Sequence, residues 1–318
     1  MRIDVHNHAF PAAVIDLVSR DDSFGVRVSG GKVVGINADH DLFDTLHDPQ
    51  AKIRELESHG LEAAVISVAP RLFSYQLEIE PATVLCQAVN SGLRAMADYD
   101  PSRLRWMGAV PLQSVTASTQ MLEALARDGA SGVEIGTTIA GRPLDASEME
   151  PFWATVERLR LPVFIHSAHV VKHPSFNEFY LSNAIGNPLE TTIAAERLVA
   201  SGVLDRHPQL RVILAHAGGF FPWQAGRLRH ATTVRPELAQ APPDPYAYCG
   251  RLIFDTITHD VSALTYLLSR VGSENVVMGT DLPYDMATPK PMHDLLAATD
   301  ADTARRVAEE NPAALFGF

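Results

Sequence analysis

The sequence predicts a single (β/α)8 barrel of the TIM type. Short runs of β-branched and aliphatic residues alternate with longer stretches of helical periodicity, which is the pattern of a parallel sheet with buried strands. There are eight such runs, and a length of 318 residues is ordinary for one barrel domain. We therefore treat residues 1–318 as one domain, in which 46% hydrophobic residues suffice for a sizeable core.

The expected strands and helices follow one another along the whole chain. The strands are predicted at 2–6, 63–68, 105–110, 132–135, 162–166, 211–216, 252–255 and 275–279. One helix is predicted at 48–60, where Asp48 is the N-cap, Pro49 begins the first turn and Gly60 ends the helix. Similar helices are predicted at 81–97, 114–128, 145–159, 188–201 and 261–271.

One segment, at about 12–47, interrupts this alternation. It contains the run from Val26 to Gly35, in which two short alternating stretches flank Gly30 and Gly31. That pattern predicts a small β-hairpin inserted over the mouth of the barrel. A second long loop, at 169–187, follows the fifth strand, and long loops on this face are where barrels place substrate contacts.

The composition argues against several classes of partner. A formal net charge of -12 disfavours nucleic acid and anionic membranes, because both bind clustered Lys and Arg. No apolar run approaches the roughly 20 residues needed to cross a bilayer, and the first residues do not resemble a secretory leader. Cys86 and Cys249 lie far apart and are expected to be reduced thiols, so we expect a cytoplasmic protein.

Polar residues lie at or just past the ends of four predicted strands: the pair His6 and His8, then His166, His216 and Asp281. The carboxyl ends of barrel strands share one rim, so these side chains are expected to converge. His6 and His8 are two residues apart and therefore point to the same side of an extended chain. Imidazoles and a carboxylate gathered in this way predict one divalent metal ion, above all Zn2+, with Mn2+ and Co2+ as alternatives. The expected ligands are His6, His8, His166 and Asp281.

His216 is the expected acid or base of this site. It ends the sixth strand and is followed by Gly218 and Gly219, which allow the backbone to turn sharply beneath a ligand. Beside a bound cation, an imidazole can take a proton from a water molecule whose pKa the ion lowers toward about 7. A fifth metal ligand is the alternative role of His216.

Several motifs, spread over the full chain, resemble the decarboxylase branch of the amidohydrolase superfamily. They begin at Ile3, Phe73, Gly132, Pro188, His216 and Gly279 and read IDVHNHAFP, FSY, GVEIGT, PLETT, HAGG and GTDLPY. The resemblance implies a (β/α)8 barrel with a small inserted sheet, a homodimer, and one divalent metal ion, usually zinc, without an organic cofactor. It assigns the acid/base role to His216, and it places the metal at the positions of His6, His8, His166 and Asp281.

Three further residues matter to this comparison. Arg227 matches an arginine that, in the branch, reaches the substrate carboxylate of the neighbouring subunit, and a surface Arg paired with an acid is the alternative. Phe73 is expected to line the substrate pocket, and a place in the core is the alternative. Glu134 lies on the fourth strand, where hydrolases with two metals often use a carbamylated lysine, and we expect it to be a salt-bridged structural carboxylate. The resemblance therefore points to one metal ion.

The chain departs from the branch in two substrate-binding segments. A second substrate arginine is missing, since residues 43–47 read FDTLH with no arginine nearby. In the loop after the fifth strand, Asn183 stands where the branch has a tryptophan, shortly before Gly186. His169 and His173 add polar groups to this loop, and we expect contacts to a substrate rather than to the metal. These departures indicate that the substrate differs from the one that the motifs alone suggest.

Together these residues predict a metal-dependent, non-oxidative decarboxylase of a small unsaturated or aromatic carboxylic acid. In this interpretation the ion would bind the carboxylate, together with a neighbouring oxygen or nitrogen, as a Lewis acid. Either Asp281 or His216 would then protonate the adjacent carbon, or metal-bound hydroxide would add to a conjugated double bond. The main alternative is a hydrolase, in which water activated at the same ion breaks a carbon–carbon, lactone or amide bond. A hydratase and a non-catalytic metal-binding scaffold are the remaining alternatives.

Overall fold

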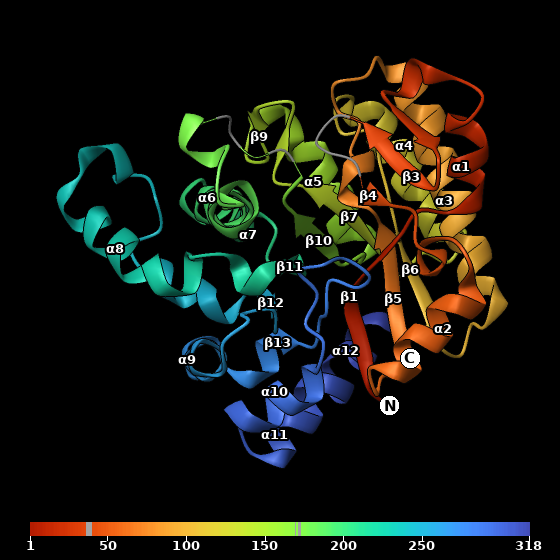
Figure 1. Ribbon diagram of the computed structural model, residues 1–318. Coiled ribbons are helices and arrows are strands. Elements are labelled where there is room, and N and C mark those ends of the chain that lie inside the picture. The colour runs from red at the N-terminus through yellow and green to blue at the C-terminus, as the bar shows by residue number, and fades with distance from the viewer. Residues whose placement is uncertain (36–39, 169, 171–172) are drawn as a thin grey trace.

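Eight parallel strands form the barrel that the sequence predicts. The computed structural model describes residues 1–35, 40–168, 170 and 173–318 (Figure 1). The strands lie side by side in chain order: β1 (Ile3–Ala9), β5 (Ala63–Val68), β6 (Leu104–Gly108), β7 (Gly132–Gly136), β10 (Val163–His166), β11 (Val212–Leu214), β12 (Ile253–Asp255) and β13 (Val276–Val277). All eight lie within two or three residues of their expected positions, because each is a buried apolar run that only a sheet covered on both faces can accommodate.

Hydrogen bonds between β1 and the segment after β13 bring the first and last strands together. The Val5 amide donates to the carbonyl of Met278 at 2.9 Å. The buried Asp4 carboxylate accepts from the amide of Thr280 at 3.0 Å and from its hydroxyl at 2.5 Å. The two ends of the sheet are therefore joined directly beneath the rim where the chain changes direction.

Apolar side chains fill the interior of the barrel. Val5, Val65, Phe164 and Ile213 belong to one buried cluster, and each comes from a different strand. The Phe164 ring lies 4.9 Å from the ring of His6. This inner cluster therefore packs beneath the polar groups of the rim. A larger core lies between the strands and the surrounding helices.

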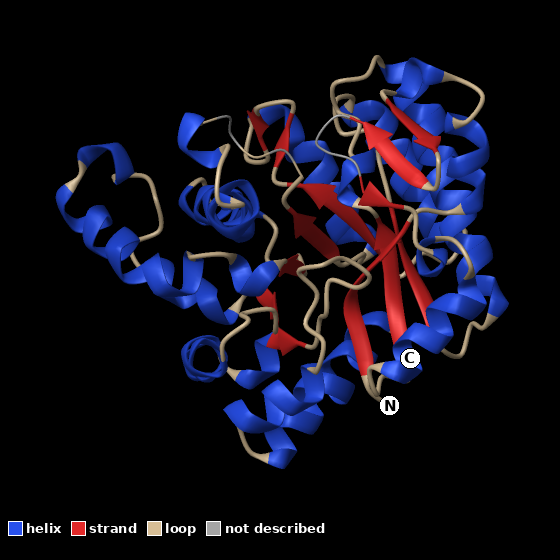
Figure 2. Ribbon diagram, in the orientation of Figure 1, coloured by secondary structure: helices blue, strands red, loops and turns tan. Residues whose placement is uncertain are grey.

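Helices surround the strands on the outside (Figure 2). Five of the predicted ones are α2 (Pro49–Ser58), α3 (Ile79–Tyr99), α4 (Val115–Arg127), α6 (Asn187–Ala200) and α9 (Val261–Val271). Asp48 caps α2 as expected, and its side chain accepts from the Gln50 amide. A sixth, α5 (Glu150–Leu159), begins five residues later than predicted, because Asp145 pairs with Arg197 and a short 3-10 turn precedes the helix.

Other helices were not predicted. They are α1 (Ala12–Val18), α7 (Val203–Arg206), α8 (Phe221–Val234), α10 (Pro291–Ala298), α11 (Ala301–Arg305) and α12 (Asn311–Phe316). The helix α8 is the most consequential of these, because it extends away from the barrel (Figure 1). None of the helices in the described ranges is long and apolar enough to cross a membrane.

The inserted segment forms the predicted hairpin and adds to it. Strands β2 (Val26–Ser29) and β3 (Lys32–Gly35) pair in antiparallel fashion around Gly30 and Gly31. A third strand, β4 (His40–Asp41), extends this sheet and is too short to show periodicity. The His40 ring lies 5.5 Å from the ring of Tyr284, which follows β13. The insertion therefore reaches the rim of the barrel. A second small hairpin, β8 (Thr138–Ile139) with β9 (Arg142–Pro143), was not predicted.

The turn after His216 requires glycine. Gly219 has a φ of +62°, and a Cβ atom there would overlap the carbonyl oxygen of Pro188 in α6. We predict that Gly219→Ala lowers the free energy of unfolding by about 2–4 kcal/mol, since it combines backbone strain with an overlap that backbone atoms cannot relieve. Gly250→Ala is the control, because a Cβ atom added at Gly250 would lie 4.0 Å from its nearest neighbour, Nδ2 of Asn275. Equal stability of the two variants in denaturant titrations would contradict this account.

Candidate metal centre and its cavity

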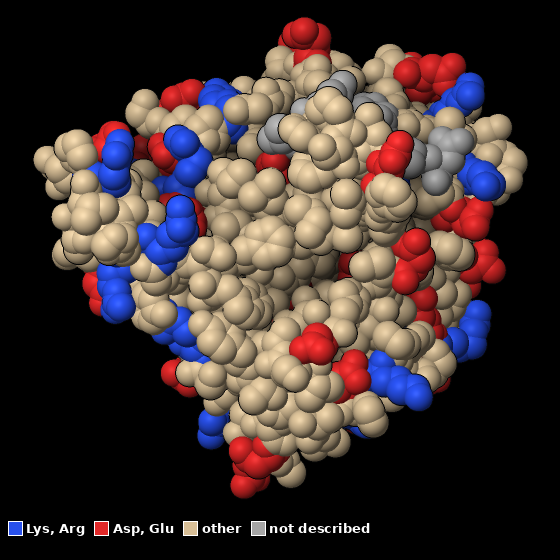
Figure 3. Space-filling view, turned by 60° about the vertical axis from the view of Figure 1, so that its left-hand side comes forward, with Lys and Arg blue, Asp and Glu red and all other residues tan. Residues whose placement is uncertain are grey.

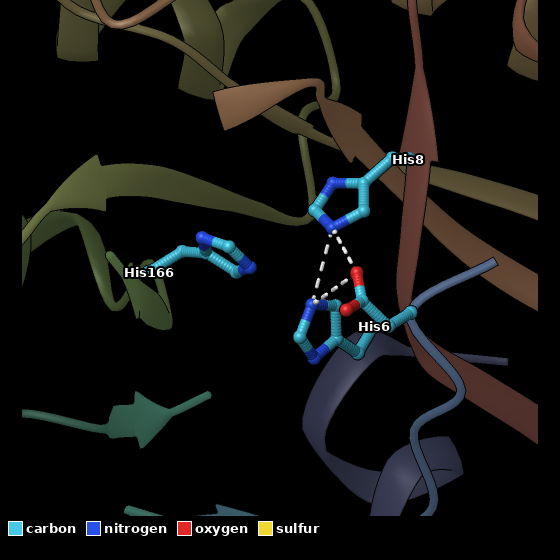
Figure 4. A group of neighbouring side chains, drawn as sticks. His6, His8 and His166 are labelled. Carbon is cyan, nitrogen blue, oxygen red and sulfur yellow. Dashed lines mark hydrogen bonds and ion pairs between the residues drawn. The ribbon is translucent and has the colours of Figure 1, made fainter. Parts of the chain in front are cut away.

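Four side chains that are distant in sequence meet at the carboxyl rim of the barrel (Figure 4). His6 and His8 come from β1, His166 ends β10, and Asp281 follows β13. One potential ligand atom from each lies within 4.8 Å of the others, and all four residues are buried. The convergence that the strand ends predicted is therefore present, in a group of the size and chemistry of a metal site.

The spacing of these atoms fits one shared ion. The Nε2 atoms of His6 and His8 lie 3.1 Å apart, and Oδ1 of Asp281 is 3.0 Å from the latter and 3.5 Å from the former. Ligands at about 2.0 to 2.1 Å from one ion are separated by about 3 Å when they subtend roughly a right or tetrahedral angle. The three atoms are therefore as far apart as three ligands of one cation should be.

His166 completes the group through an unpartnered nitrogen. Its Nδ1 donates to the carbonyl of Ser167 at 2.6 Å, which leaves the lone pair on Nε2. That Nε2 is buried and has no hydrogen-bond partner among the described residues. The ring lies 5.0 Å from the ring of His6 and 5.1 Å from that of His8. A cation bound between these rings would accept the lone pair of this buried, unpaired Nε2 atom.

Asp255 holds the site in place, although the sequence identified it only as the last residue of a strand. Its carboxylate accepts from Nδ1 of His6 at 2.7 Å. It also accepts backbone amides from His216 at 2.9 Å, Ala217 at 2.7 Å and Ile257 at 3.0 Å. One fully buried carboxylate thus directs Nε2 of His6 toward the other ligands and fixes the turn that carries His216.

The charges of the group favour a cation at its centre. Burial opposes protonation of His6, but Asp281 and Asp255 outweigh it and raise the pKa of His6 to about 10. Burial would raise the pKa of Asp281, yet His6 and the neighbouring imidazoles hold it well below its usual range. Burial lowers the pKa of His8 to about 4. The carboxylates therefore stay ionised and stabilise positive charge at this position, which is the proton on His6 when no cation is bound, while His8 presents neutral imidazole, the form that binds metals.

His216 lies beside this group and outside it. It begins a 3-10 turn after β11, and its Nε2 is 3.6 Å from Oδ2 of Asp281. Its ring is 4.9 Å from that of His166, and its Nδ1 is buried without a hydrogen-bond partner among the described residues. This position is close enough for proton exchange with a group bound beside Asp281.

A cavity of about 410 Å³ opens next to His216 and Asp281, which both line it. Asn183, a predicted substrate contact, also lies in its wall, together with Trp223 and His259. No lysine or arginine belongs to the part of this wall that the structure describes. Figure 3 shows a recess surrounded mainly by uncharged atoms on this side of the molecule. The volume suits a small organic molecule of one ring.

The other predicted contacts lie elsewhere. Arg227 is exposed on α8 and does not line the cavity of its own chain. Phe73 is 2% exposed and stacks on Tyr75 in the core, which is the second of its two expected roles. His169 lies outside the described residues. Glu134 is fully buried, and burial raises its pKa well above the usual value. Neither carboxylate oxygen of Glu134 has a hydrogen-bond partner among the described residues, and no lysine or arginine there pairs with it, so the expected salt bridge is wrong.

The chain matches the amidohydrolase family model over residues 3–318. It belongs to the amidohydrolase family. A relative, the 2-amino-3-carboxymuconate-6-semialdehyde decarboxylase of Dictyostelium discoideum, is 32% identical over 247 residues, which cover 77% of this chain and 69% of the relative. The resemblance stated from the motifs is thereby confirmed.

Solved structures share the fold. The apo form of Metarhizium anisopliae IDCase superposes with a TM-score of 0.89 at 21% identity, over 100% of this chain and 97% of that one. A dihydroxybenzoic acid decarboxylase from a Polaromonas species, solved with bound manganese and the inhibitor 2-nitroresorcinol, gives a TM-score of 0.78 at 21% identity, over 99% and 96% of the two chains. The barrel is therefore a fold that this chain shares with these solved structures.

The Asp255 contacts lead to a prediction about metal affinity. Asp255→Asn replaces one accepting oxygen by an amide that cannot accept from both His6 and the backbone donors, so the His6 ring loses its orientation. We expect the affinity for Zn2+ to fall about 10- to 100-fold. Competition with a chromophoric chelator measures this. Asp145→Asn, which alters an ion pair with the half-exposed Arg197, is the control, and an equal loss in both variants would refute the role of Asp255.

Proposed function

We propose that this protein is a metal-dependent, non-oxidative decarboxylase of a small aromatic or unsaturated carboxylic acid. The observation that carries the proposal is the buried group of three imidazoles and one carboxylate, beside which His216 and Asp281 face a cavity of one-ring size. The 32% identical relative is named a decarboxylase, as is the manganese-bound neighbour. No feature of the described residues favours hydrolysis over this reaction.

The proposed cofactor is one divalent ion bound by His6, His8, His166 and Asp281. We favour Zn2+ on the chemistry of three imidazoles and one carboxylate, while Mn2+, which the neighbour contains, and Co2+ accept the same ligands. When bound, a divalent ion supplies a Lewis acid that holds the substrate carboxylate and an adjacent oxygen. No organic cofactor is part of the proposal.

The chain's own residues supply the proton that replaces carbon dioxide. With Nε2 at 3.6 Å from the Asp281 carboxylate, His216 can hold a proton between itself and that acid. Delivery of this proton to the carbon that bears the carboxylate breaks the conjugation of the ring or diene. The carbon–carbon bond then breaks, its electron pair returns to the conjugated system, and carbon dioxide leaves. The net change is one proton gained for one carbon dioxide lost.

We further propose a homodimer in which α8 reaches the neighbouring site. This helix extends from the barrel, and its Trp223 and Val234 side chains remain exposed, as does Tyr266, on which Trp223 stacks. Arg227 lies on the same helix and is exposed. A guanidinium delivered from a second copy would supply a cation, which the described part of the cavity wall does not contain. The free, buried thiols of Cys86 and Cys249 support a reducing, cytoplasmic location.

The function is tested by supplying hydroxybenzoates and carboxylated dienes to metal-loaded protein and measuring released carbon dioxide. We expect turnover that a chelator abolishes and that Zn2+, Mn2+ or Co2+ restores. His216→Asn should lower kcat about 10²- to 10⁴-fold while the metal still binds, because it removes only the proton carrier. The control is His293→Asn on the exposed face of α10. Incorporation of water oxygen into a cleaved product, without carbon dioxide, would establish hydrolysis instead.

The role of Arg227 is tested by mixing inactive subunits. Arg227→Ala and His216→Asn each inactivate their own homodimer, but in a mixed dimer one site has an intact His216 and receives an intact Arg227. We therefore expect recovery to about a quarter of the wild-type activity after subunit exchange. No recovery would mean that Arg227 acts within its own chain, and full activity of Arg227→Ala alone would mean that it does not act at all. Arg235→Ala, which alters an exposed ion pair with Glu237, should be fully active alone.

A further inference from the structure

His259 lines the same cavity as His216 and Asp281, although no motif singled it out. It follows β12, in the loop that leads to α9, and is exposed where His216 is half-buried and Asp281 is buried. Neither ring nitrogen makes a hydrogen bond or ion pair to any residue in the described ranges. The imidazole therefore stands at the outer end of the cavity with its hydrogen-bonding capacity unused.

The backbone of His259 is strained. Its φ is +55°, in the left-handed region, which costs an L-residue of order 1–3 kcal/mol. His216, Ala217 and Asp281 also have positive φ, and all three line this cavity. Non-glycine residues in this conformation cluster at sites where a side chain must be aimed. His259 thus shares the feature that marks the two reactive residues of the site.

Hydrogen bonds on both sides of His259 maintain the strained loop. The Thr258 amide donates to the carbonyl of Thr256 at 2.9 Å, and the Thr258 hydroxyl donates to the carbonyl of Asp260 at 2.8 Å. The Asp260 carboxylate in turn caps α9 by accepting from the Ala263 amide at 2.7 Å. The frame around His259 is consequently fixed, while its ring is left for a ligand.

The neighbouring wall indicates what kind of ligand this is. Asn183, Asn187 and Thr258 contribute neutral polar groups, and Trp223 contributes an aromatic face. Because the described wall has no lysine or arginine, it offers no strong partner for a second carboxylate at this end. It does offer hydrogen bonds to a neutral oxygen attached to a ring.

We infer that His259 is a specificity-determining residue that hydrogen-bonds to a neutral oxygen substituent of the substrate, such as a ring hydroxyl, at the end away from the reacting carboxylate. This inference rests on the proposed decarboxylase function, since it presumes that a carboxylate lies at the inner end beside Asp281. It narrows the substrate class to acids with a neutral oxygen substituent on the ring or diene.

Matched pairs of acids that differ only by hydroxyl or hydrogen at one position test the inference. We expect the metal-loaded wild type to prefer the hydroxylated member of one pair by at least about tenfold in kcat/KM and in binding measured by calorimetry. His259→Gly should reduce that preference to within about threefold. Its Tm should stay equal or rise, because glycine adopts positive φ without strain. His259→Asn, which tolerates this conformation and still donates, should retain part of the preference.

Two results would overturn the role of His259. One is an unchanged preference in His259→Gly, and the other is a wild type that turns acids over without discriminating within any pair. A lower Tm together with unchanged preference would identify the residue as purely structural. The control for His259→Gly is a substitution of another exposed histidine, His293, which lies in α10. Because glycine destabilises a helix, the control variant is His293→Asn. If wild type neither binds nor decarboxylates any acid, the proposed function itself is wrong, and the two failures are thereby distinguished.

Discussion

The buried carboxylate of Asp255 is the constraint on which the site depends. It accepts hydrogen bonds from His6 on the first strand and from the backbone of the turn that carries His216. The orientation of His6, a proposed metal ligand, and the position of His216, the proposed proton carrier, are therefore set by one side chain. The bond to His6 lowers the pKa of this Asp255 carboxylate against the opposing effect of burial. A carboxylate in this position must remain ionised to hold both partners, and the positive charge that keeps it ionised comes from the same cluster.

Strain near the cavity is offset by packing and hydrogen bonds elsewhere. His216, Ala217 and Asp281 adopt positive φ, and Gly219 completes the turn beneath Pro188. These conformations persist because Asp255 accepts the amides of the turn and because Asp4 accepts from Thr280 just before Asp281. These hydrogen bonds hold the groups proposed to react in place without a bound ligand.

Sequence reasoning predicted the barrel and the four-residue cluster because both follow from where apolar runs end. A strand end places His166 or Asp281 at the rim whatever the details of packing. It did not identify Asp255, since one acid at a strand end carries no signal of the donors that surround it. The sequence analysis also predicted an ion pair for Glu134, which the described residues do not form. The sequence of one strand does not show whether a residue on another strand lies opposite it with the opposite charge. The helix α8 was missed because its polar and apolar residues show little periodicity, as suits a helix that projects from the barrel.

The distribution of cations explains how one barrel can select among acids. Within a single chain, the described wall of the cavity is neutral apart from the reacting cluster, so attraction for a carboxylate is concentrated at the inner end. In the proposed homodimer, the guanidinium of Arg227 would add charge where a second copy places it, so the affinity for a charged group would depend on assembly. The remaining wall would then discriminate between substrates through neutral hydrogen bonds. A substrate that leaves a polar group of the wall unpaired loses more binding free energy than a substrate that pairs it gains. Under these proposals, the groups for catalysis and the group for selectivity lie at opposite ends of the same cavity.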